Sequence, residues 1–191
     1  MHTKLRQDIY AMTLSAVCGA MGFLLMAYAQ FPIVPAYSFL RFDPGEFAML
    51  LAGVTMGPRA GVMAVAVKDL LYLLFRAKSP FGPIADFIAC SSFVYVVSLI
   101  TRQRKDTAGL AMACVIGTIA RIIVMIPANV IILRLQFGFG FSKVMSMVWP
   151  VIVPFNVVKS LTNALIVIPL IAALKRTAII SVTLGRERGG H

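Results

Sequence analysis

Charged residues are scarce in this chain. They make up 13% of its 191 residues, whereas 60% are hydrophobic, and soluble domains carry about 25% charged residues. Apolar runs recur along the sequence at about 20 residues, the length that a helix needs to cross a bilayer. The ten-residue alternation typical of membrane β-barrels is missing. The composition therefore excludes a soluble domain and predicts an all-α integral membrane protein.

Several catalytic motifs are also absent. There is no GxxxxGK(S/T) loop, so the chain lacks the usual means of hydrolysing ATP. There is no HExxH or GxSxG motif, which argues against common hydrolase chemistry. The three cysteines, Cys18, Cys90 and Cys114, lie within apolar runs without metal-ligand spacing, so they are expected to pack as small hydrophobic side chains. The sequence predicts no metal, no cofactor and no catalytic residue.

Acidic residues are few beside the basic ones. The chain has 7 Asp and Glu against 18 Lys and Arg, a formal charge of +11. In a soluble protein this excess would point to nucleic acid. In a membrane protein it is typical of cytoplasmic loops. We therefore expect these basic residues to lie near membrane lipid, and we expect no nucleic-acid partner.

Six membrane-spanning helices are predicted, at residues 8–29, 44–57, 59–76, 84–101, 108–135 and 146–174. The second helix is short, because its residues reach only about 21 Å at 1.5 Å per residue, against a hydrocarbon core of roughly 30 Å. Its ends should therefore be sheltered by protein. Residues 1–176 are expected to form one membrane domain, and residues 177–191 a basic, disordered tail.

The distribution of basic residues predicts the orientation. Ten of the 18 Lys and Arg residues fall on the side that holds both termini, five on the other side and three within spans. The side richer in Lys and Arg is normally cytoplasmic. Both termini are therefore predicted to be cytoplasmic; a prokaryotic cell membrane is what the family resemblance described below implies.

Three polar residues inside the spans need a physical reason, because an ionisable side chain at the bilayer centre costs about 2.5–3.5 kcal/mol. Asn156 and Lys159 are three residues apart in the last helix, so they share one face. In the predicted orientation they lie in the outer to middle part of the membrane. Asn129, in the fifth helix, is expected at a similar depth.

The outer loops bring further residues to the same side. Phe39 and Leu40 follow the first helix, Phe81 and Gly82 precede the fourth, and Asp86 lies near the start of the fourth. An asparagine amide offers donors and an acceptor, and a lysine offers donors. With apolar side chains covering its faces, a planar ligand with a polar edge would suit such a pocket.

A different interpretation of these polar residues is purely structural. Lys159 would then pair with an acid such as Asp69 or Asp86, and the asparagines would bridge helices. Spacing alone does not separate the two interpretations.

Lys68 and Asp69 are adjacent in a helix and are expected to have separate partners. Arg121 is expected in an internal ion pair or at the inner surface. The few acids within the spans argue against an ion-coupled carrier.

Small residues form two rows in the first helix. Ala16 and Ala20 are four residues apart, and Ala11, Ser15 and Gly19 form a parallel row. Such rows allow a second helix to approach closely. That helix could belong to this chain or to a separate membrane subunit.

Four segments carry a resemblance to a known family. They are FLRFDPGEFAMLLAG at 39–53, GPRAGVMAVAVKDLL at 57–71, GPIADFIA at 82–89 and PFNVVKSL at 154–161. Over about residues 8–175 the chain resembles the substrate-binding S component of an energy-coupling factor (ECF) vitamin transporter. The GPxxG element is shared broadly among S components, and the FNxxK element resembles the riboflavin-specific type.

The resemblance implies a function that spacing alone does not give. An S component captures a vitamin from outside and delivers it inward when coupled to a transmembrane T component and two ATP-binding cassette ATPases, so it is not itself an enzyme. By this resemblance, riboflavin is the ligand, and flavin mononucleotide (FMN) is a second possibility. The implied residues are Leu40, Gly82, Asn129, Asn156 and Lys159 for the ligand, and Ala16 and Ala20 for docking onto the T component.

Three other functions stay open from the sequence. The chain could be an S component for another vitamin, such as thiamin or biotin. It could be a solitary small-molecule carrier without ATPase partners. It could also be a structural membrane subunit, in which case it would bind no ligand saturably.

Overall fold

The computed structural model describes residues 2–33, 40–104 and 106–176. The elements in chain order are α1 (His2–Ala29), β1 (Phe31–Pro32), β2 (Arg41–Phe42), α2 (Glu46–Met56), α3 (Pro58–Phe75), α4 (Phe81–Gln103), α5 (Thr107–Phe137), α6 (Phe141–Met147), the π-helical turn η1 (Val148–Ile152) and α7 (Val153–Arg176). The predicted tail at 177–191 and the predicted site residue Phe39 lie outside the described residues.

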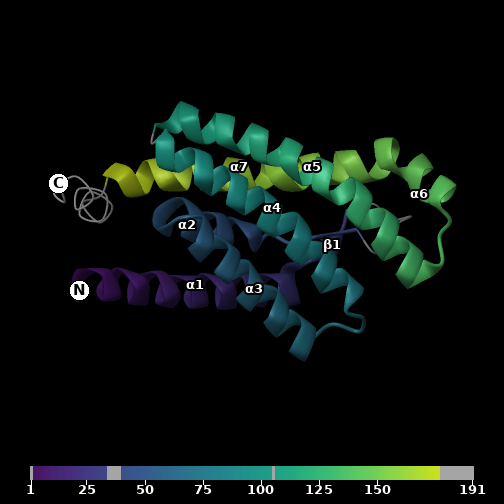
Figure 1. The fold of residues 1–191 in the computed structure, drawn as a ribbon, viewed down its shortest axis with the longest axis horizontal. Helices are drawn as coiled ribbons and strands as arrows, with labels where there is room; N and C mark the ends of the chain where they lie inside the picture. Colours follow the sequence, from purple (N-terminus) through teal and green to yellow (C-terminus); the bar gives the residue numbers. More distant parts are fainter. Residues whose placement is uncertain (1, 34–39, 105, 177–191) are drawn as a thin grey trace.

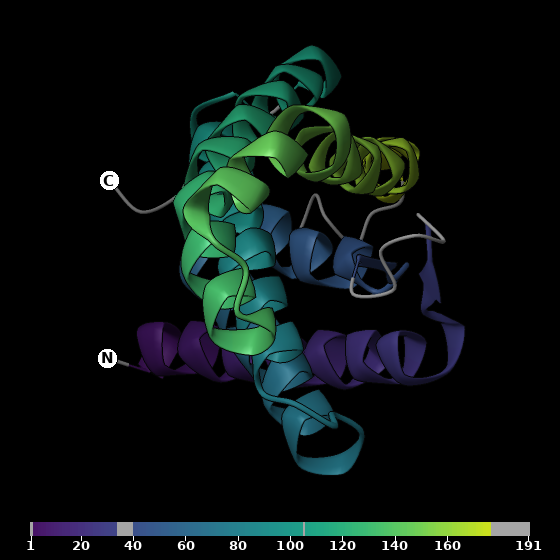
Figure 2. The same ribbon diagram turned by 90° about the vertical axis from the view of Figure 1, so that its right-hand side faces the viewer.

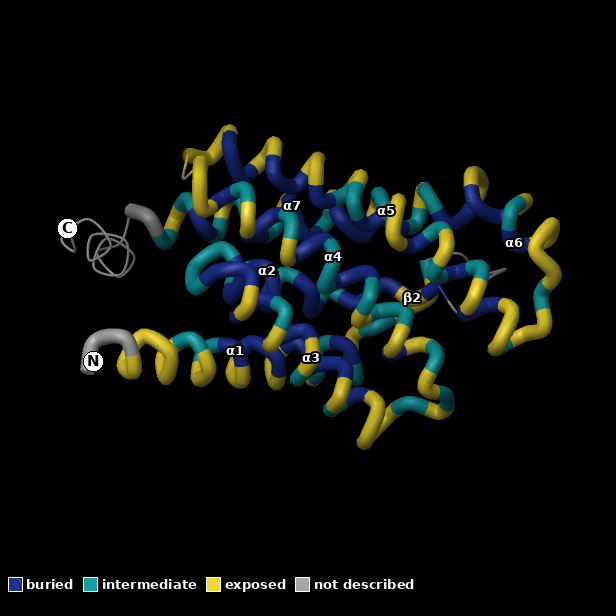
Figure 3. The backbone as a smooth tube through the Cα atoms, viewed as in Figure 1, coloured by how far each residue is buried: buried dark blue, intermediate teal, exposed yellow. Residues whose placement is uncertain are grey.

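Within the described residues, the fold is helical apart from one small strand pair. It confirms six helical segments, because α6, η1 and α7 follow one another without a break. Figure 1 shows the start of α1 and the end of α7 at one end of the molecule, with β1 and α6 at the other. Seen along the bundle, α2 lies between α1 on one side and α7 on the other (Figure 2). Buried residues follow the inward faces of the helices, and exposed residues follow the outward faces of α1 and α5 (Figure 3).

Four segments in the described part of the chain are long and apolar enough to cross a membrane: Leu5–Ala29, Phe81–Gln103, Thr107–Phe137 and Phe141–Leu174. The helix α2 is short, as predicted, with 11 residues, which reach only about 17 Å. The helix α3 has 18 residues but carries three charged ones, and two of these, Lys68 and Asp69, are buried. Neighbouring helices therefore keep those two charges away from lipid.

The break between α2 and α3 depends on Gly57. Its φ of 102° lies in the left-handed region, where glycine has no side chain to clash. Pro58 follows at the first position of α3, where its missing N–H costs no helical hydrogen bond. The Gly-Pro pair thus ends one helix and begins the next without a loop.

The predicted boundaries differ from the structure in several places, and α1, for example, begins at His2 rather than at residue 8. Residues 31–32 and 41–42 form an antiparallel strand pair inside the predicted first loop. Gly82 lies in the first turn of α4, not before it. The last helical segment begins at Phe141, earlier than predicted, and passes through η1. That turn contains Pro150 and is followed by Pro154, and neither proline can donate a backbone hydrogen bond.

Close packing of α2, α3 and α4 depends on a second glycine. A Cβ added at Gly61 would lie 2.5 Å from Val94 Cγ1 and 2.8 Å from the Cα of Gly53. We expect Gly61→Ala to lower the free energy of unfolding by about 1–3 kcal/mol, because backbone must shift to admit the methyl group. Thermal melting in detergent measures this. Gly140→Ala is the control, since nothing lies within 4 Å of its added Cβ; equal melting of the two variants would contradict the packing account.

Candidate functional site

A cavity of about 320 Å³ lies toward the end of the bundle that carries β2 and the start of α4. This volume is at the lower end of the range for small-molecule sites, about 300–1,000 Å³. Six of the seven predicted ligand residues line it: Leu40, Gly82, Asp86, Asn129, Asn156 and Lys159. The structure therefore brings together residues from a loop, α4, α5 and α7.

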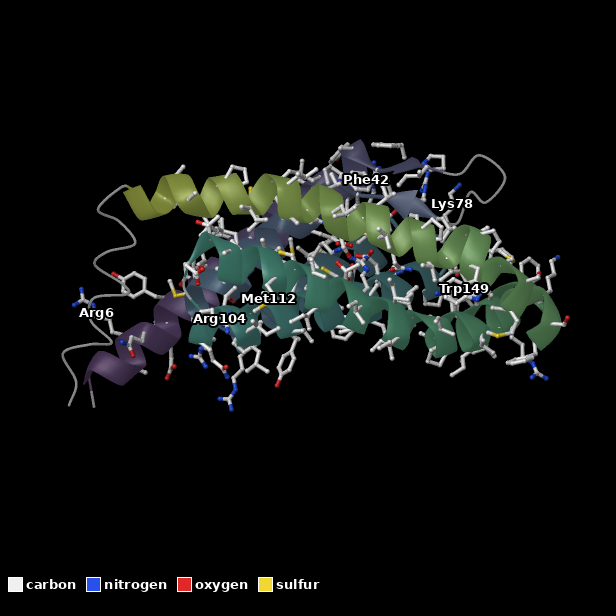
Figure 4. The ribbon with its side chains drawn as sticks, turned by 90° about the horizontal axis from the view of Figure 1, so that it is seen from above. Arg6, Phe42, Lys78, Arg104, Met112 and Trp149 are labelled. Carbon is white, nitrogen blue, oxygen red and sulfur yellow. The ribbon has the colours of Figure 1, made fainter. Side chains whose placement is uncertain are left out.

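The cavity has apolar walls and a basic rim. Met125, Ile132, Leu133 and Phe155 are among the apolar residues that line it. The basic residues in its lining that lie near helix ends and loops are Arg41, Arg76 and Lys78. Figure 4 shows Lys78 toward the same end of the molecule as Trp149, with Arg6 and Arg104 toward the other end. A ligand with an apolar body and polar edges fits this distribution.

Lys159 lies among three carboxylates. Its Nζ is 2.5 Å from Asp86 Oδ1, 2.6 Å from Glu46 Oε1 and 3.7 Å from Asp43 Oδ2. Lys159 is only 2% exposed. The pairing of Lys159 with Asp86 is thus confirmed, whereas the alternative partner Asp69 is wrong. Because both residues of the pair also line the cavity, ion pairing and pocket lining are compatible.

Lys68 is the second buried lysine of this region. Its Nζ is 3.5 Å from Asp43 Oδ2 and 3.4 Å from Asp69 Oδ1, and it also donates to Asp86 Oδ2. The prediction that Lys68 and Asp69 have separate partners is wrong. Adjacent positions on a helix point apart at Cβ, but the long, flexible lysine stem brings its ammonium group back to the neighbouring carboxylate.

Arg121 forms an internal ion pair, which confirms one of its two predicted roles. Its Nη1 and Nη2 donate to the two carboxylate oxygens of Glu46, at 2.8 and 3.0 Å. Neither side chain is exposed. Glu46 also accepts a hydrogen bond of 2.8 Å from Asn163 Nδ2. This planar, two-bond geometry is the strong form of an arginine–carboxylate pair and joins α2 to α5.

These contacts make one buried ion network, which we define as Asp43, Glu46, Lys68, Asp69, Asp86, Arg121 and Lys159. It contains four of the seven acidic residues in the chain, so the expectation of few acids within the spans missed this cluster. Three of its carboxylates, from Asp43, Glu46 and Asp86, lie within 4.8 Å of one another. The ammonium groups of Lys68 and Lys159 lie against them.

The two asparagines have different hydrogen-bond partners. Asn129 Nδ2 donates to the Met125 carbonyl at 2.8 Å. Asn156 Nδ2 donates to the Ile152 carbonyl at 2.8 Å, and its Oδ1 accepts from Arg121 Nε at 2.9 Å. Among the described residues, nothing donates to Asn129 Oδ1. Asn129 therefore keeps a free acceptor, whereas the acceptor of Asn156 is occupied.

The two rows of small residues in α1 face different surroundings. Ser15 is buried and donates to the Ala60 carbonyl of α3 at 2.9 Å. A Cβ at Gly19 would lie 2.7 Å from Val67 Cβ. This row packs within the chain, whereas Ala16 and Ala20 are exposed. The row of Ala11, Ser15 and Gly19 thus packs within the chain, and the face with Ala16 and Ala20 is exposed.

Sequence comparison assigns the family. Residues 10–171 match the family model described as ECF transporter, substrate-specific component. The chain belongs to this family of S components. Its fold is similar to a solved structure of the S component of a bacterial ECF transporter, with a TM-score of 0.77 and 30% sequence identity over 88% of this chain and 97% of that one. It is therefore a non-enzymatic subunit of a bacterial transporter and a multi-pass membrane protein.

Named relatives of this S component are riboflavin transporters. RibU of Staphylococcus aureus is 30% identical over 171 residues, which cover 86% of this chain and 89% of the relative. FmnP of Bacillus subtilis is 30% identical over 148 residues, covering 72% and 77%. RibU of Streptococcus thermophilus is 27% identical over 156 residues, covering 76% and 74%. S components of this family pair with a T component and ATPases.

Proposed function

We propose that this S component binds riboflavin in the cavity lined by Asn129, Asn156 and Lys159. The observation that carries the proposal is the meeting of these three residues in one cavity, in a chain whose named relatives are riboflavin transporters. The flavin ring is planar and apolar on its faces, with an edge of carbonyl and N–H groups. The apolar walls would cover its faces, and the asparagine amides would meet its edge.

The free acceptor of Asn129 supports this ligand. Asn129 is only 6% exposed, but it lines the cavity, and its Oδ1 has no donor among the described residues. A ring N–H would supply that donor. Leu40 and Gly82, together with Asp86, line the same cavity, and Phe39 is included in the proposed site from the sequence alone, as the residue before Leu40.

We also propose the direction of delivery and the docking face. The cavity lies away from the end of the molecule that holds the start of α1 and the end of α7. With both termini cytoplasmic, the cavity would face outward and take up the vitamin there. Ala16 and Ala20 would dock onto the T component, whose two ATPases would drive release inward.

A ligand panel tests the proposal. Purified protein is titrated into riboflavin, and quenching of flavin fluorescence is followed to its endpoint. We expect a tight endpoint at one ligand per chain, with no competition from thiamin or biotin. FMN is a further arm, since Arg41, Arg76 and Lys78 line the cavity and could lie near a phosphate. A well-folded protein that fails to quench riboflavin fluorescence would contradict the proposal.

Asn156→Ala is expected to weaken riboflavin binding by roughly tenfold or more, because losing one buried polar partner costs about 1–3 kcal/mol. The same titration measures the dissociation constant. Lys159→Ala should also weaken binding. Thr162→Ala is the control, since Thr162 lies on the same helix and its hydroxyl bonds only the Val158 carbonyl. Unchanged affinity in both site variants would remove the proposed site.

A further inference from the structure

We infer that Arg121 is a positioning residue that makes Asn156 a hydrogen-bond donor toward the ligand, with Glu46 holding Arg121 in place. The inference rests on the proposed function, because it concerns how the same site selects its ligand. It assigns a role to two fully buried residues that the sequence did not connect: they are 75 positions apart in the chain.

The argument starts with the chemistry of the guanidinium group. An arginine can donate hydrogen bonds but cannot accept them. Arg121 Nε lies 2.9 Å from the side-chain amide of Asn156. The amide atom that faces Arg121 must therefore be the oxygen, and the two possible flips of Asn156 are no longer equivalent. A backbone carbonyl reinforces this choice, because Ile152 accepts from Nδ2 at 2.8 Å.

The consequence is that the orientation of the Asn156 amide is fixed. Its Oδ1 accepts from Arg121, and one hydrogen of Nδ2 is bonded to the Ile152 carbonyl. The second hydrogen of Nδ2 is the group that it can offer to a molecule in the cavity it lines. Asn129 differs at its oxygen: one hydrogen of its Nδ2 is likewise bonded, to the Met125 carbonyl, but its Oδ1 accepts from none of the described residues.

The cavity thus presents a donor from α7 and an acceptor from α5. A ligand edge that carries a carbonyl beside an N–H group satisfies both. Mismatched polarity at such a site is costly, since each buried group would be left without its partner. Arg121 therefore influences which ligand ring edges the cavity can bind, because it sets the orientation of the Asn156 amide.

Glu46 fixes the orientation of Arg121. Two parallel hydrogen bonds from Nη1 and Nη2 to one carboxylate define the plane of the guanidinium group, as bidentate pairs do. Glu46 also contacts Lys159 at 2.6 Å and accepts from Asn163 at 2.8 Å. The short helix α2 thereby sets the positions of two polar groups at the cavity from α5 and α7.

The test compares riboflavin with its 2-thio and 4-thio analogues, in which sulfur replaces one ring carbonyl oxygen. Sulfur is a weaker acceptor, so at least one analogue should bind the unmodified protein about tenfold more weakly. In Arg121→Lys, a single ammonium group cannot serve both Glu46 and Asn156 in the fork geometry. We expect this variant to bind riboflavin more weakly. It should also bind that analogue less than about threefold more weakly than it binds riboflavin.

Two reference variants calibrate the comparison. Asn156→Ala lacks the donor, so the analogue and riboflavin should bind this variant almost equally. Adding Arg121→Lys to Asn156→Ala should change the ratio of the two affinities little. Arg134→Lys makes the same substitution at an exposed position of α5 and should keep the tenfold penalty of the unmodified protein. If Arg121→Lys does not fold, Glu46→Gln takes its place. In that variant the difference in affinity between the analogue and riboflavin should also decrease, but by less than in Arg121→Lys.

The possible failures are distinct. A purely structural Arg121 would weaken riboflavin and both analogues by the same factor, and an unchanged penalty in Arg121→Lys, or in Glu46→Gln where that variant is used, would overturn the inference. Equal binding of riboflavin and both analogues by the unmodified protein would also overturn it. Absence of riboflavin binding by the folded protein would instead overturn the proposed function on which the inference rests.

Discussion

Replacing Glu46 with alanine is expected to lower the free energy of unfolding by about 3–5 kcal/mol, because it breaks a buried ion pair from one side. Glu46 has no exposed surface and accepts two hydrogen bonds from Arg121. It also accepts from Asn163 and contacts Lys159. Removing the carboxylate leaves Nη1 and Nη2 of the buried Arg121 without their acceptor, while Asn163 Nδ2 keeps only its bond to the Lys159 carbonyl. Thermal and denaturant unfolding in detergent measure the change.

Asp106→Ala is the matched control for Glu46→Ala. Asp106 caps α5 by accepting from the Gly109 N–H at 3.1 Å, and losing such a cap typically costs about 1 kcal/mol. Both variants remove one carboxylate, but only Glu46→Ala removes a member of the ion network. Equal destabilisation by the two substitutions would show that the network contributes little to the fold.

Placing leucine at both Ala16 and Ala20 is expected to abolish vitamin uptake and leave ligand binding intact. Both alanines are exposed on α1, away from the row that packs on α3. Small side chains allow close approach of a second helix, so two leucines would hold the T component away. A loss of only about 1.4 kcal/mol in that contact is a tenfold loss of complex. We expect at least a tenfold drop in riboflavin uptake by whole cells.

Two measurements separate docking from binding in this variant. Fluorescence titration of the purified double variant should give the same dissociation constant as the unmodified protein. Ala111→Leu is the control for added bulk, since Ala111 is an exposed alanine on α5, and its uptake should be normal. Normal uptake by the Ala16→Leu, Ala20→Leu variant would exclude this face as the docking surface.

The sequence predicted the helices and much of the cavity because both depend on local signals. Long apolar runs predict membrane helices by length, and the three-residue spacing of Asn156 and Lys159 places them on one face. The order and direction of the helices placed Asn129, Leu40, Gly82 and Asp86 on the same side, and the family resemblance assigned Leu40 and Gly82 to the ligand. The structure places all of these residues around the cavity.

The ion network could not be predicted in the same way. Glu46 lies in the first turn of a short helix, and its partner Arg121 lies 75 residues further along the chain. Spacing within one helix contains no information about such a pair, since it depends on how α2 packs against α5 and α7. One signal was available: each buried cation needs an anion, and the chain has only seven acidic residues to supply one.

The network also changes how Lys159 is understood. It was expected either to contact a ligand or to pair with an acid, and it is held by Asp86 and Glu46 at 2.5 and 2.6 Å. Two carboxylates therefore lie within hydrogen-bonding distance of its ammonium group, and a third, from Asp43, is 3.7 Å away. The asparagines also have unused hydrogen-bonding capacity at the cavity, and with Lys159 held by these acids we expect them to determine the ligand edge that fits.

The absorption spectrum of protein purified from cells grown with riboflavin tests the central claim most directly. We expect the bands of bound flavin at one flavin per chain after detergent exchange and gel filtration. The same preparation of Asn156→Ala should retain clearly less flavin. A colourless, folded protein that also fails to take up added riboflavin would contradict the assignment of the cavity as a flavin site.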